Sequence, residues 1–249
     1  MNTAIIIGAT SGIGREVAVR LVEGGWKVGI TGRRTGALEA FRSQYGADKV
    51  FISTMDVTRD DSVQALDTLL DQTGAPNLFF YASGVGYQNR ELNLEKEIRT
   101  VRTNCEGMVR MVDHFIGYVR SHEYAYANQA HVAVITSVAG VAALGTAPAY
   151  SATKRMQSTY LSALAQLSRM EHIPVRFTDI RPGFVATDIL NPDKHYPMLM
   201  SKEKATDHIM KALRRKKRVY TFDWRFRVAT FFWRLIPRGI WERITWIKN

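Results

Sequence analysis

Short apolar runs alternate with longer mixed segments along the first 190 residues of the chain. The runs have the length of strands, and the mixed segments have the apolar spacing of helices. We predict strands over 4–7, 27–31, 50–54, 77–81, 131–136 and 175–180, with 218–222 as a candidate seventh, and helices near 12–23, 35–45, 62–72, 98–120 and 150–169. Such alternation implies right-handed βαβ units, and therefore a parallel sheet covered on both faces. The predicted fold class is α/β: a doubly wound, three-layer αβα sandwich that binds ligands at the carboxyl ends of its strands.

Residues 223–249 follow a different pattern. Apolar residues recur there at helical spacing, and Pro237, with Gly239 two residues later, should divide the segment into two short helices. The segment is rich in large aromatic side chains: Trp224, Phe226, Phe231, Phe232, Trp233, Trp241 and Trp246. We therefore divide the chain into a single domain over 1–222 and a helical, aromatic C-terminal tail over 223–249.

Charge separates the same two regions. The formal charge is +11, and residues 202–249 supply +10 of it with 14 Lys and Arg against 4 Asp and Glu. A neutral body with a basic, aromatic tail indicates either a membrane-surface anchor or a segment that packs on the body or on a second subunit. Nucleic-acid binding through 211–218 (KALRRKKR) is a third, disfavoured alternative, because no recognised nucleic-acid-binding motif accompanies the run.

Composition bears on the compartment. Apolar runs are shorter than the roughly 18 residues of a spanning helix. The apolar run at the N-terminus is too short for a signal peptide and is interpreted as the first strand. Cys105 is the only cysteine and forms no internal disulfide, which favours the cytoplasm. We expect it to be a small packed side chain rather than a nucleophile. The tail adds a peripheral location on the inner face of the membrane to this expectation.

A glycine-rich turn follows the first predicted strand directly. Gly8, Gly12 and Gly14 have the spacing G-x-x-x-G-x-G and open a helix. Glycine allows a sharp turn close to a pyrophosphate, and the free N–H groups of the helix start favour the anion. The context is that of a dinucleotide-binding Rossmann fold. The expected phosphate contacts are Gly8, Thr10, Ser11, Gly12, Ile13 and Gly14.

The end of the second strand bears on which nicotinamide cofactor would bind. A carboxylate that holds the ribose 2′-OH of NAD is expected there, but the chain has Arg33 and Arg34. Guanidinium groups suit a 2′-phosphate by charge and by geometry, and Arg15 could add to them. This favours NADP(H) over NAD(H), against the alternative that these arginines are solvated surface charges.

Several further segments contain candidate functional residues, and their order along the chain is informative. Asp56-Val57 follows the third strand, Tyr81-Ala82-Ser83-Gly84 ends the fourth, Asn104 lies in the long helix, Ser137 ends the fifth strand, Tyr150 and Lys154 form Y-x-x-x-K, and Arg181-Pro182-Gly183-Phe184-Val185-Ala186-Thr187 ends the sixth. Over about 3–190 the chain resembles the classical short-chain dehydrogenase/reductase family. It departs at Ile7, where Thr is common, and at Tyr81 and Ala82, which replace two asparagines.

The resemblance implies a carbonyl–alcohol oxidoreductase with a catalytic tetrad. Tyr150 would be the general acid or base, and Lys154 would lower its pKa and bond the nicotinamide ribose. Ser137 would donate to the substrate oxygen, and Asn104 would hold a water that links Lys154 to solvent. The implied cofactor contacts are Asp56, Val57, Ala82, Ser83, Gly84, Tyr150, Lys154, Pro182, Gly183, Val185 and Thr187. A homo-oligomer is implied too, paired through the helices that hold Asn104 and Tyr150.

The substrate side is less defined. Residues 188–200 should form a substrate loop, and with 141–144 they could form an apolar wall in which methionines adapt to varied ligands. A plain surface loop is the alternative. The six histidines have no metal-ligand spacing, so we predict no metal. A non-catalytic NADP(H)-binding protein stays open as a second function, because fold does not imply activity.

Overall fold

Seven parallel strands form one sheet in the computed structural model, which describes residues 2–191 and 195–245. Their order is β3-β2-β1-β4-β5-β6-β7. The strands are β1 Thr3–Ile7, β2 Lys27–Gly32, β3 Val50–Thr54, β4 Leu78–Tyr81, β5 Ala130–Ile135, β6 Val175–Pro182 and β7 Val219–Phe222. The seven predicted strands, the candidate seventh included, are therefore confirmed. Trp246 and 192–194, which entered the predictions for the tail and the substrate loop, lie outside the described residues.

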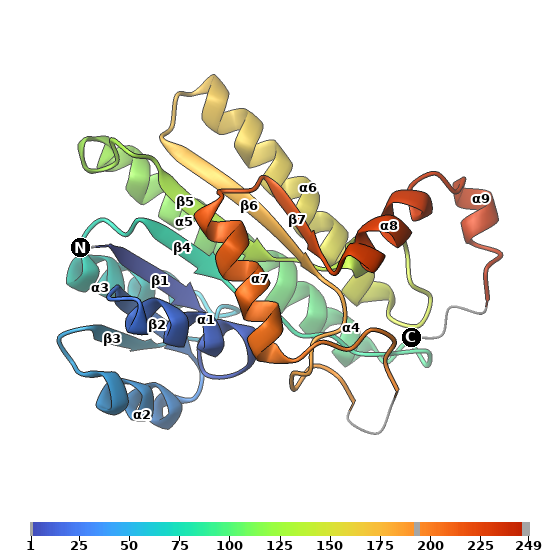
Figure 1. Cartoon of the computed structure of the whole chain (residues 1–249), viewed down its shortest axis with the longest axis horizontal. Coiled ribbons are helices and arrows are strands. Elements are labelled where there is room, and N and C mark those ends of the chain that lie inside the picture. Colours follow the sequence, from blue (N-terminus) through green and yellow to red (C-terminus); the bar gives the residue numbers. More distant parts are fainter. Residues whose placement is uncertain (1, 192–194, 246–249) are drawn as a thin grey trace.

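Both faces of the sheet are covered because side chains alternate along each strand. Ile5 and Ile7 pack into one core with α3 Ser62–Thr73, α5 Gly107–Ser121 and α6 Pro148–Met170. Ala4 and Ile6 pack into the other core with α1 Gly12–Glu23, α2 Thr35–Tyr45 and α7 Lys202–Arg214. Figure 1 shows α1 and α7 in front of the sheet with α5 and α6 behind it. The three-layer doubly wound fold is confirmed.

The strand order places the site. The chain moves outward from β1 to β3 and then returns to add β4 on the other side of β1. Such a reversal opens a crevice between the two connections at the carboxyl ends of the strands. It brings the glycine turn after β1 beside the segment 82–85 that follows β4. Ala82 N–H bonds Ile7 O at 2.8 Å, across these two strand ends.

The long helix predicted over 98–120 is longer and contains an irregular turn. It begins as α4 Leu94–Val101, passes through a π turn at Arg102–Glu106 and continues as α5. Gly107 N–H bonds Arg102 O, five residues back. Two side chains bond carbonyls of this turn: Tyr81 Oη donates to Thr103 O at 3.2 Å, and Gln157 Nε2 to Asn104 O at 2.8 Å. π turns are frequent at functional sites.

Helix α7 was not predicted. Its sequence is rich in charged residues. Its apolar positions Ala205, Ile209, Ala212 and Leu213 are nevertheless all buried and have helical spacing. Ser201 caps its start by accepting from Lys204 N. The apolar spacing was therefore a usable signal, masked by the many charges between those positions.

The tail forms two short helices, α8 Trp224–Trp233 and α9 Arg238–Trp241, with Pro237 just before the second. Phe226 is buried against Gly183, where an added Cβ would lie 2.2 Å from the ring. Trp241 Nε1 donates to Ala143 O at 2.7 Å. The described tail thus packs on the body near the ends of β6 and β7, at the right of Figure 1.

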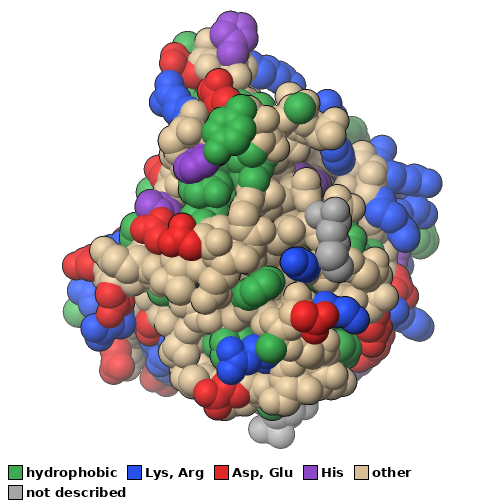
Figure 2. Space-filling model, turned by 90° about the vertical axis from the view of Figure 1, so that its left-hand side faces the viewer, with side chains coloured by type: hydrophobic (Ala, Val, Ile, Leu, Met, Phe, Trp, Pro, Cys, Tyr) green, Lys and Arg blue, Asp and Glu red, His purple; other side chains and the backbone are tan. Residues whose placement is uncertain are grey.

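The opposite face of the molecule is the one at which the strands begin. Figure 2 shows this face, with a group of Lys and Arg side chains along its right-hand edge and Asp and Glu side chains on both sides. Arg214, Arg215, Lys216 and Lys217 are exposed and directly precede β7, so they belong to this end of the sheet. The basic run 211–218 is therefore separated from the arginines of α8 by the length of β7.

Candidate active site

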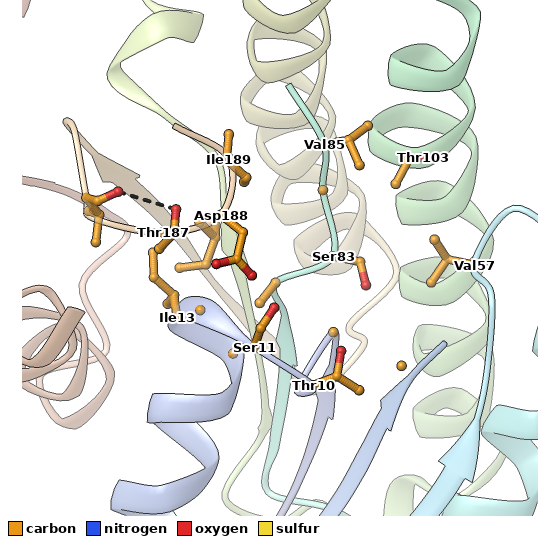
Figure 3. A pocket seen from close by; sticks show the side chains of 18 of the residues that line it. Thr10, Ser11, Ile13, Val57, Ser83, Val85, Thr103, Thr187, Asp188 and Ile189 are labelled. Atoms are coloured by element: carbon orange, nitrogen blue, oxygen red, sulfur yellow. Dashed lines mark hydrogen bonds between the residues drawn. The ribbon is translucent and has the colours of Figure 1, made fainter. Parts of the chain in front are cut away.

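A cleft of about 470 Å³ lies at the carboxyl ends of the strands. Figure 3 shows Thr10, Ser11 and Ile13 near the start of α1, Thr187–Ile189 above them, and Ser83 and Val85 on the neighbouring segment. All predicted cofactor contacts line this cleft: Gly8, Thr10, Ser11, Gly12, Ile13, Gly14, Arg33, Arg34, Asp56, Val57, Ala82, Ser83, Gly84, Tyr150, Lys154, Pro182, Gly183, Val185 and Thr187. Folding thus brings the predicted set together.

The glycine turn requires its glycines. Gly8 and Gly12 have φ values of +90° and +58°, which L side chains rarely adopt. A Cβ on Gly14 would lie 2.1 Å from Gly8 O. Ser11 makes no side-chain cap bond to the start of α1. The first N–H groups of the helix therefore stay available to an anion in the cleft.

The end of the cleft that Arg33, Arg34 and Asp56 line is polar and basic. Arg34 Nη2 donates to Thr10 Oγ1 at 3.2 Å, which ties the strand end to the glycine turn. Burial acts to raise the pKa of Asp56, but hydrogen bonds from Thr58 and the charge of Arg33 outweigh it and hold the pKa below its usual value. Arg15 lies over the Phe41 ring, 5.8 Å from its centroid, and is not among the residues that line the cleft.

Tyr150, Lys154 and Ser137 meet at the inner end of the cleft. Tyr150 and Lys154 are four residues apart on α6 and share a face. Burial raises the Tyr150 pKa, while a hydrogen bond with Ser137 acts to lower it. Lys154 is only 4% exposed, and its Nζ donates to Ile135 O at 2.9 Å. Burial lowers the Lys154 pKa to about 8, although the charge of Asp179 acts in the opposite direction.

Asn104 lies behind the cleft and does not line it. Its side chain clamps the Val85 backbone: Oδ1 accepts from Val85 N at 2.9 Å, and Nδ2 donates to Val85 O at 2.8 Å. Nδ2 also donates to Thr153 Oγ1 at 3.0 Å. Asn104 therefore contacts Lys154 only indirectly, through the side chain of Gln157, which bonds both.

Several residues of the site were missed from the sequence. Asp179 is buried, accepts from Thr136 Oγ1 at 2.5 Å, and pairs with Arg181 at 2.6 Å. The added lining residues are Gly32, Met55, Val85, Tyr87, Arg99, Thr103, Ile135 and Thr136. Arg99 and Thr103 share a helical face one turn apart beside Asn104, so spacing from Asn104 was a usable signal. The departure at Tyr81 also has a structural use, since its hydroxyl bonds the π turn.

The substrate side differs from the expected apolar wall. Asp188, Ile189 and Leu190 line the cleft, but 141–144 does not. The tail reaches that segment instead, through the bond of Trp241 to Ala143. Met198 and Met200 line a separate small hollow with Gly183, Phe184 and Phe226. Within the described part of the loop, the methionines therefore pack with the tail rather than at the cleft.

Over 2–191 and 195–245, no three His, Cys, Asp or Glu side chains gather in a way that could hold a metal ion. Among the helices of these same ranges, none is both long and apolar enough to cross a membrane.

The sequence comparisons decide the family. The family model for short chain dehydrogenases matches residues 2–196. The chain belongs to the short-chain dehydrogenase family. An uncharacterized oxidoreductase of Myxococcus xanthus is 28% identical over 251 residues, which cover 97% of this chain and 95% of that protein. An uncharacterized oxidoreductase of Mycobacterium tuberculosis is 25% identical over 245 residues and 96% of each chain.

Solved structures share the fold of this short-chain dehydrogenase. A serine dehydrogenase complexed with NADP+ superposes with a TM-score of 0.74 at 21% identity, covering 88% of this chain and 94% of the other. A short-chain dehydrogenase from Burkholderia phymatum in complex with NAD has a TM-score of 0.76 at 20% identity and covers 92% of each chain. The two were solved with different nicotinamide cofactors, and at these identities the likeness concerns the fold.

Proposed function

We propose that the chain is an NADP(H)-dependent oxidoreductase that interconverts a carbonyl and a secondary alcohol. The observation that carries this proposal is the buried ammonium of Lys154, held beside Tyr150 and Ser137 at the inner end of the cleft. Burying an ammonium costs free energy, so its retention in a cleft is typical of a functional site. The nucleotide would lie along the glycine turn, with its phosphates at the start of α1.

The residues have separate tasks in the reduction. A bound NADPH supplies the hydride that becomes the new C–H bond. Ser137 orients the substrate oxygen by hydrogen bonding, and Tyr150 Oη gives its proton to that oxygen as negative charge develops there. The Lys154 ammonium favours the phenolate that remains, because an opposite charge nearby lowers a phenol pKa. Oxidation of the alcohol is the same path in reverse, with Tyr150 as the base.

The preference for NADP(H) rests on the adenosine end of the cleft. Arg33 and Arg34 both line it, and neither forms an ion pair with a carboxylate in the described residues. Two guanidinium groups without a carboxylate partner are suited to a 2′-phosphate. NAD(H) remains the second choice for the cofactor.

The experiment is a carbonyl panel with NADPH consumption measured for the wild type and for Tyr150→Phe. We expect turnover to fall at least about 100-fold in the variant while NADPH affinity stays within a few-fold, because only the proton donor is lost. Tyr160→Phe is the matched control: Tyr160 lies on the same helix and bonds Asp113 outside the cleft. Equal turnover by Tyr150→Phe contradicts the mechanism. NADPH binding without turnover across the panel supports the alternative, a non-catalytic NADP(H)-binding protein.

The proposed substrate is apolar or lipid-like, and the proposed location is the cytoplasm, at the inner face of the membrane. Helix α8 supports this, because it is apolar on two opposite sides. Phe226 and Thr230 are buried, whereas Trp224, Val228 and Phe231 form an exposed stripe at i, i+4 and i+7, which Leu235 continues just past the end of the helix. Exposed arginines flank the stripe: Arg225, Arg227, Arg234 and Arg238. An apolar stripe between cations suits an anionic lipid surface.

A membrane is favoured over pairing of this stripe with a second copy, because symmetric pairing would bring the flanking arginines together. The family resemblance proposes a homo-oligomer through other surfaces. Exposed Leu94, Ile98 and Val101 on α4 are available for such an interface. Light scattering behind size exclusion tests this, and a monomer mass contradicts it.

A further inference from the structure

Gln157 occupies a position between two groups of the proposed active site. Its side chain is 0% exposed, although a glutamine is normally a surface residue. Its Oε1 accepts from Lys154 Nζ at 3.0 Å, and its Nε2 donates to Asn104 O at 2.8 Å. Both ends of the amide are therefore used, and each is used by a predicted catalytic residue.

The fold explains why Gln157 reaches both groups. Tyr150, Lys154 and Gln157 lie at i, i+4 and i+7 on α6, so they share one helical face. The π turn at Arg102–Glu106 displaces the helix ladder opposite this face. The carbonyl of Asn104 in that turn accepts the Gln157 amide.

The ammonium of Lys154 has three N–H donors. One bonds Ile135 O and another bonds Gln157 Oε1, so one is left for a ligand. The Nζ lies at the wall of the cleft, since a Cβ added to Gly84 would be 3.5 Å from it. Two fixed acceptors thus hold the lysine so that its remaining N–H can donate to a ligand in the cleft.

We propose that Gln157 is a positioning residue, which fixes the Lys154 ammonium in its charged form and takes both contacts that the family resemblance gives to a water. The proposal rests on the proposed function of Tyr150 and Lys154. A side-chain amide donates and accepts hydrogen bonds without ionising near neutral pH, so it does not pass protons onward. A proton that leaves Tyr150 is then replaced from the open side of the cleft rather than through Asn104.

A plain packing role for Gln157 makes a different prediction. A neutral acceptor on an ammonium stabilises the charged form, and a carboxylate at the same place stabilises it more. Gln157→Leu removes the acceptor with little change in size, and Gln157→Glu adds a negative charge with almost none. The two variants should therefore move the titration of Lys154 in opposite directions, whereas a packing defect moves it in neither.

The test follows NADPH binding by fluorescence from pH 6 to 10, which needs no known substrate. In the wild type, affinity should fall as Lys154 loses its proton near its pKa of about 8. We expect Gln157→Leu to shift this fall downward by about one pH unit and Gln157→Glu to shift it upward by at least as much. Gln166→Leu and Gln166→Glu, at an exposed glutamine of the same helix, should leave it unchanged.

Thermal melts accompany the titrations. If Gln157→Leu does not fold, Gln157→Glu alone decides, because it keeps the shape of the side chain. Transitions that stay at the wild-type pH in the folded variants overturn the proposal. That result is distinct from failure of the proposed function, which would appear as turnover by Tyr150→Phe.

Discussion

At the scale of single residues, the cations in and around the cleft have different surroundings. Lys154 is buried and bonded by two neutral acceptors. Arg181 is paired with Asp179 in the interior. Arg33 and Arg34 have no carboxylate partner in the described residues and line the cleft. A charge without a carboxylate partner is the one best placed to bind an anionic ligand.

The first prediction concerns Arg33. Arg33→Asp should lower the NADPH-to-NADH preference by about 100-fold or more, because a carboxylate repels a 2′-phosphate and accepts from a ribose 2′-OH. Binding or kinetic titrations with the two cofactors measure the ratio. Arg15→Asp is the control, since Arg15 lies over Phe41 and not at the cleft. An unchanged ratio in Arg33→Asp would show that the 2′-phosphate is held elsewhere.

At the scale of elements, the sheet contains a histidine whose pKa is lower in the folded protein than in the unfolded chain. His131 in β5 is buried, and its Nε2 shares a 2.8 Å hydrogen bond with Thr178 Oγ1 of β6. Burial, together with the charges of Lys216 and Arg176, lowers the His131 pKa to about 4. The unfolded chain takes up the proton near the ordinary value of about 6.5. Between these values the unfolded state binds more protons, so stability falls as pH falls.

The second prediction follows from that difference. Between pH 6.5 and 4, the wild type should lose up to about 3 kcal/mol more unfolding free energy than His131→Gln, which keeps a partner for Thr178 but does not titrate. Denaturant unfolding across this pH range measures the slope. His172→Asn serves as the control, because His172 is exposed and its positive φ suits asparagine. Parallel slopes for wild type and His131→Gln would assign the acid sensitivity to other groups.

At the scale of the whole molecule, the basic charge of residues 202–249 divides between two ends. The run before β7 faces the end where the strands begin, and the arginines of α8 lie past its carboxyl end. The aromatic residues of the tail divide as well. Phe226 is 4% exposed and packs on Gly183 of the cleft, whereas Phe231 on the same helix is 60% exposed. The tail therefore has one side that packs on the body and another that is exposed.

The third prediction separates these two sides. Phe226→Ala should cost about 3 kcal/mol of unfolding free energy, because it empties a packed site, whereas Phe231→Ala should cost less than about 0.5 kcal/mol. In flotation with vesicles of mixed neutral and anionic lipids, Phe231→Ala should reduce vesicle binding more than Phe226→Ala does. The wild type should float, and Trp224→Ser with Phe231→Ser should stay in solution with an unchanged melting temperature. Wild-type protein that does not float with the vesicles at low salt contradicts the proposal that the tail binds a membrane surface.

The sequence by itself determined the strands, their parallel arrangement, the glycine turn and the predicted cofactor contacts, which all line the cleft. These follow from local rules: side-chain periodicity, the steric freedom of glycine and the four-residue spacing of Tyr150 and Lys154 on one helix. Only the tertiary structure decided the rest. The bond of Gln157 to Asn104, the bond of Thr136 to Asp179 and the packing of Phe226 on Gly183 all join segments that lie far apart in the chain. Their contacts depend on how helices and strands pack together. The periodicity of one segment shows which of its side chains are buried, but not which side chain of another segment packs against them.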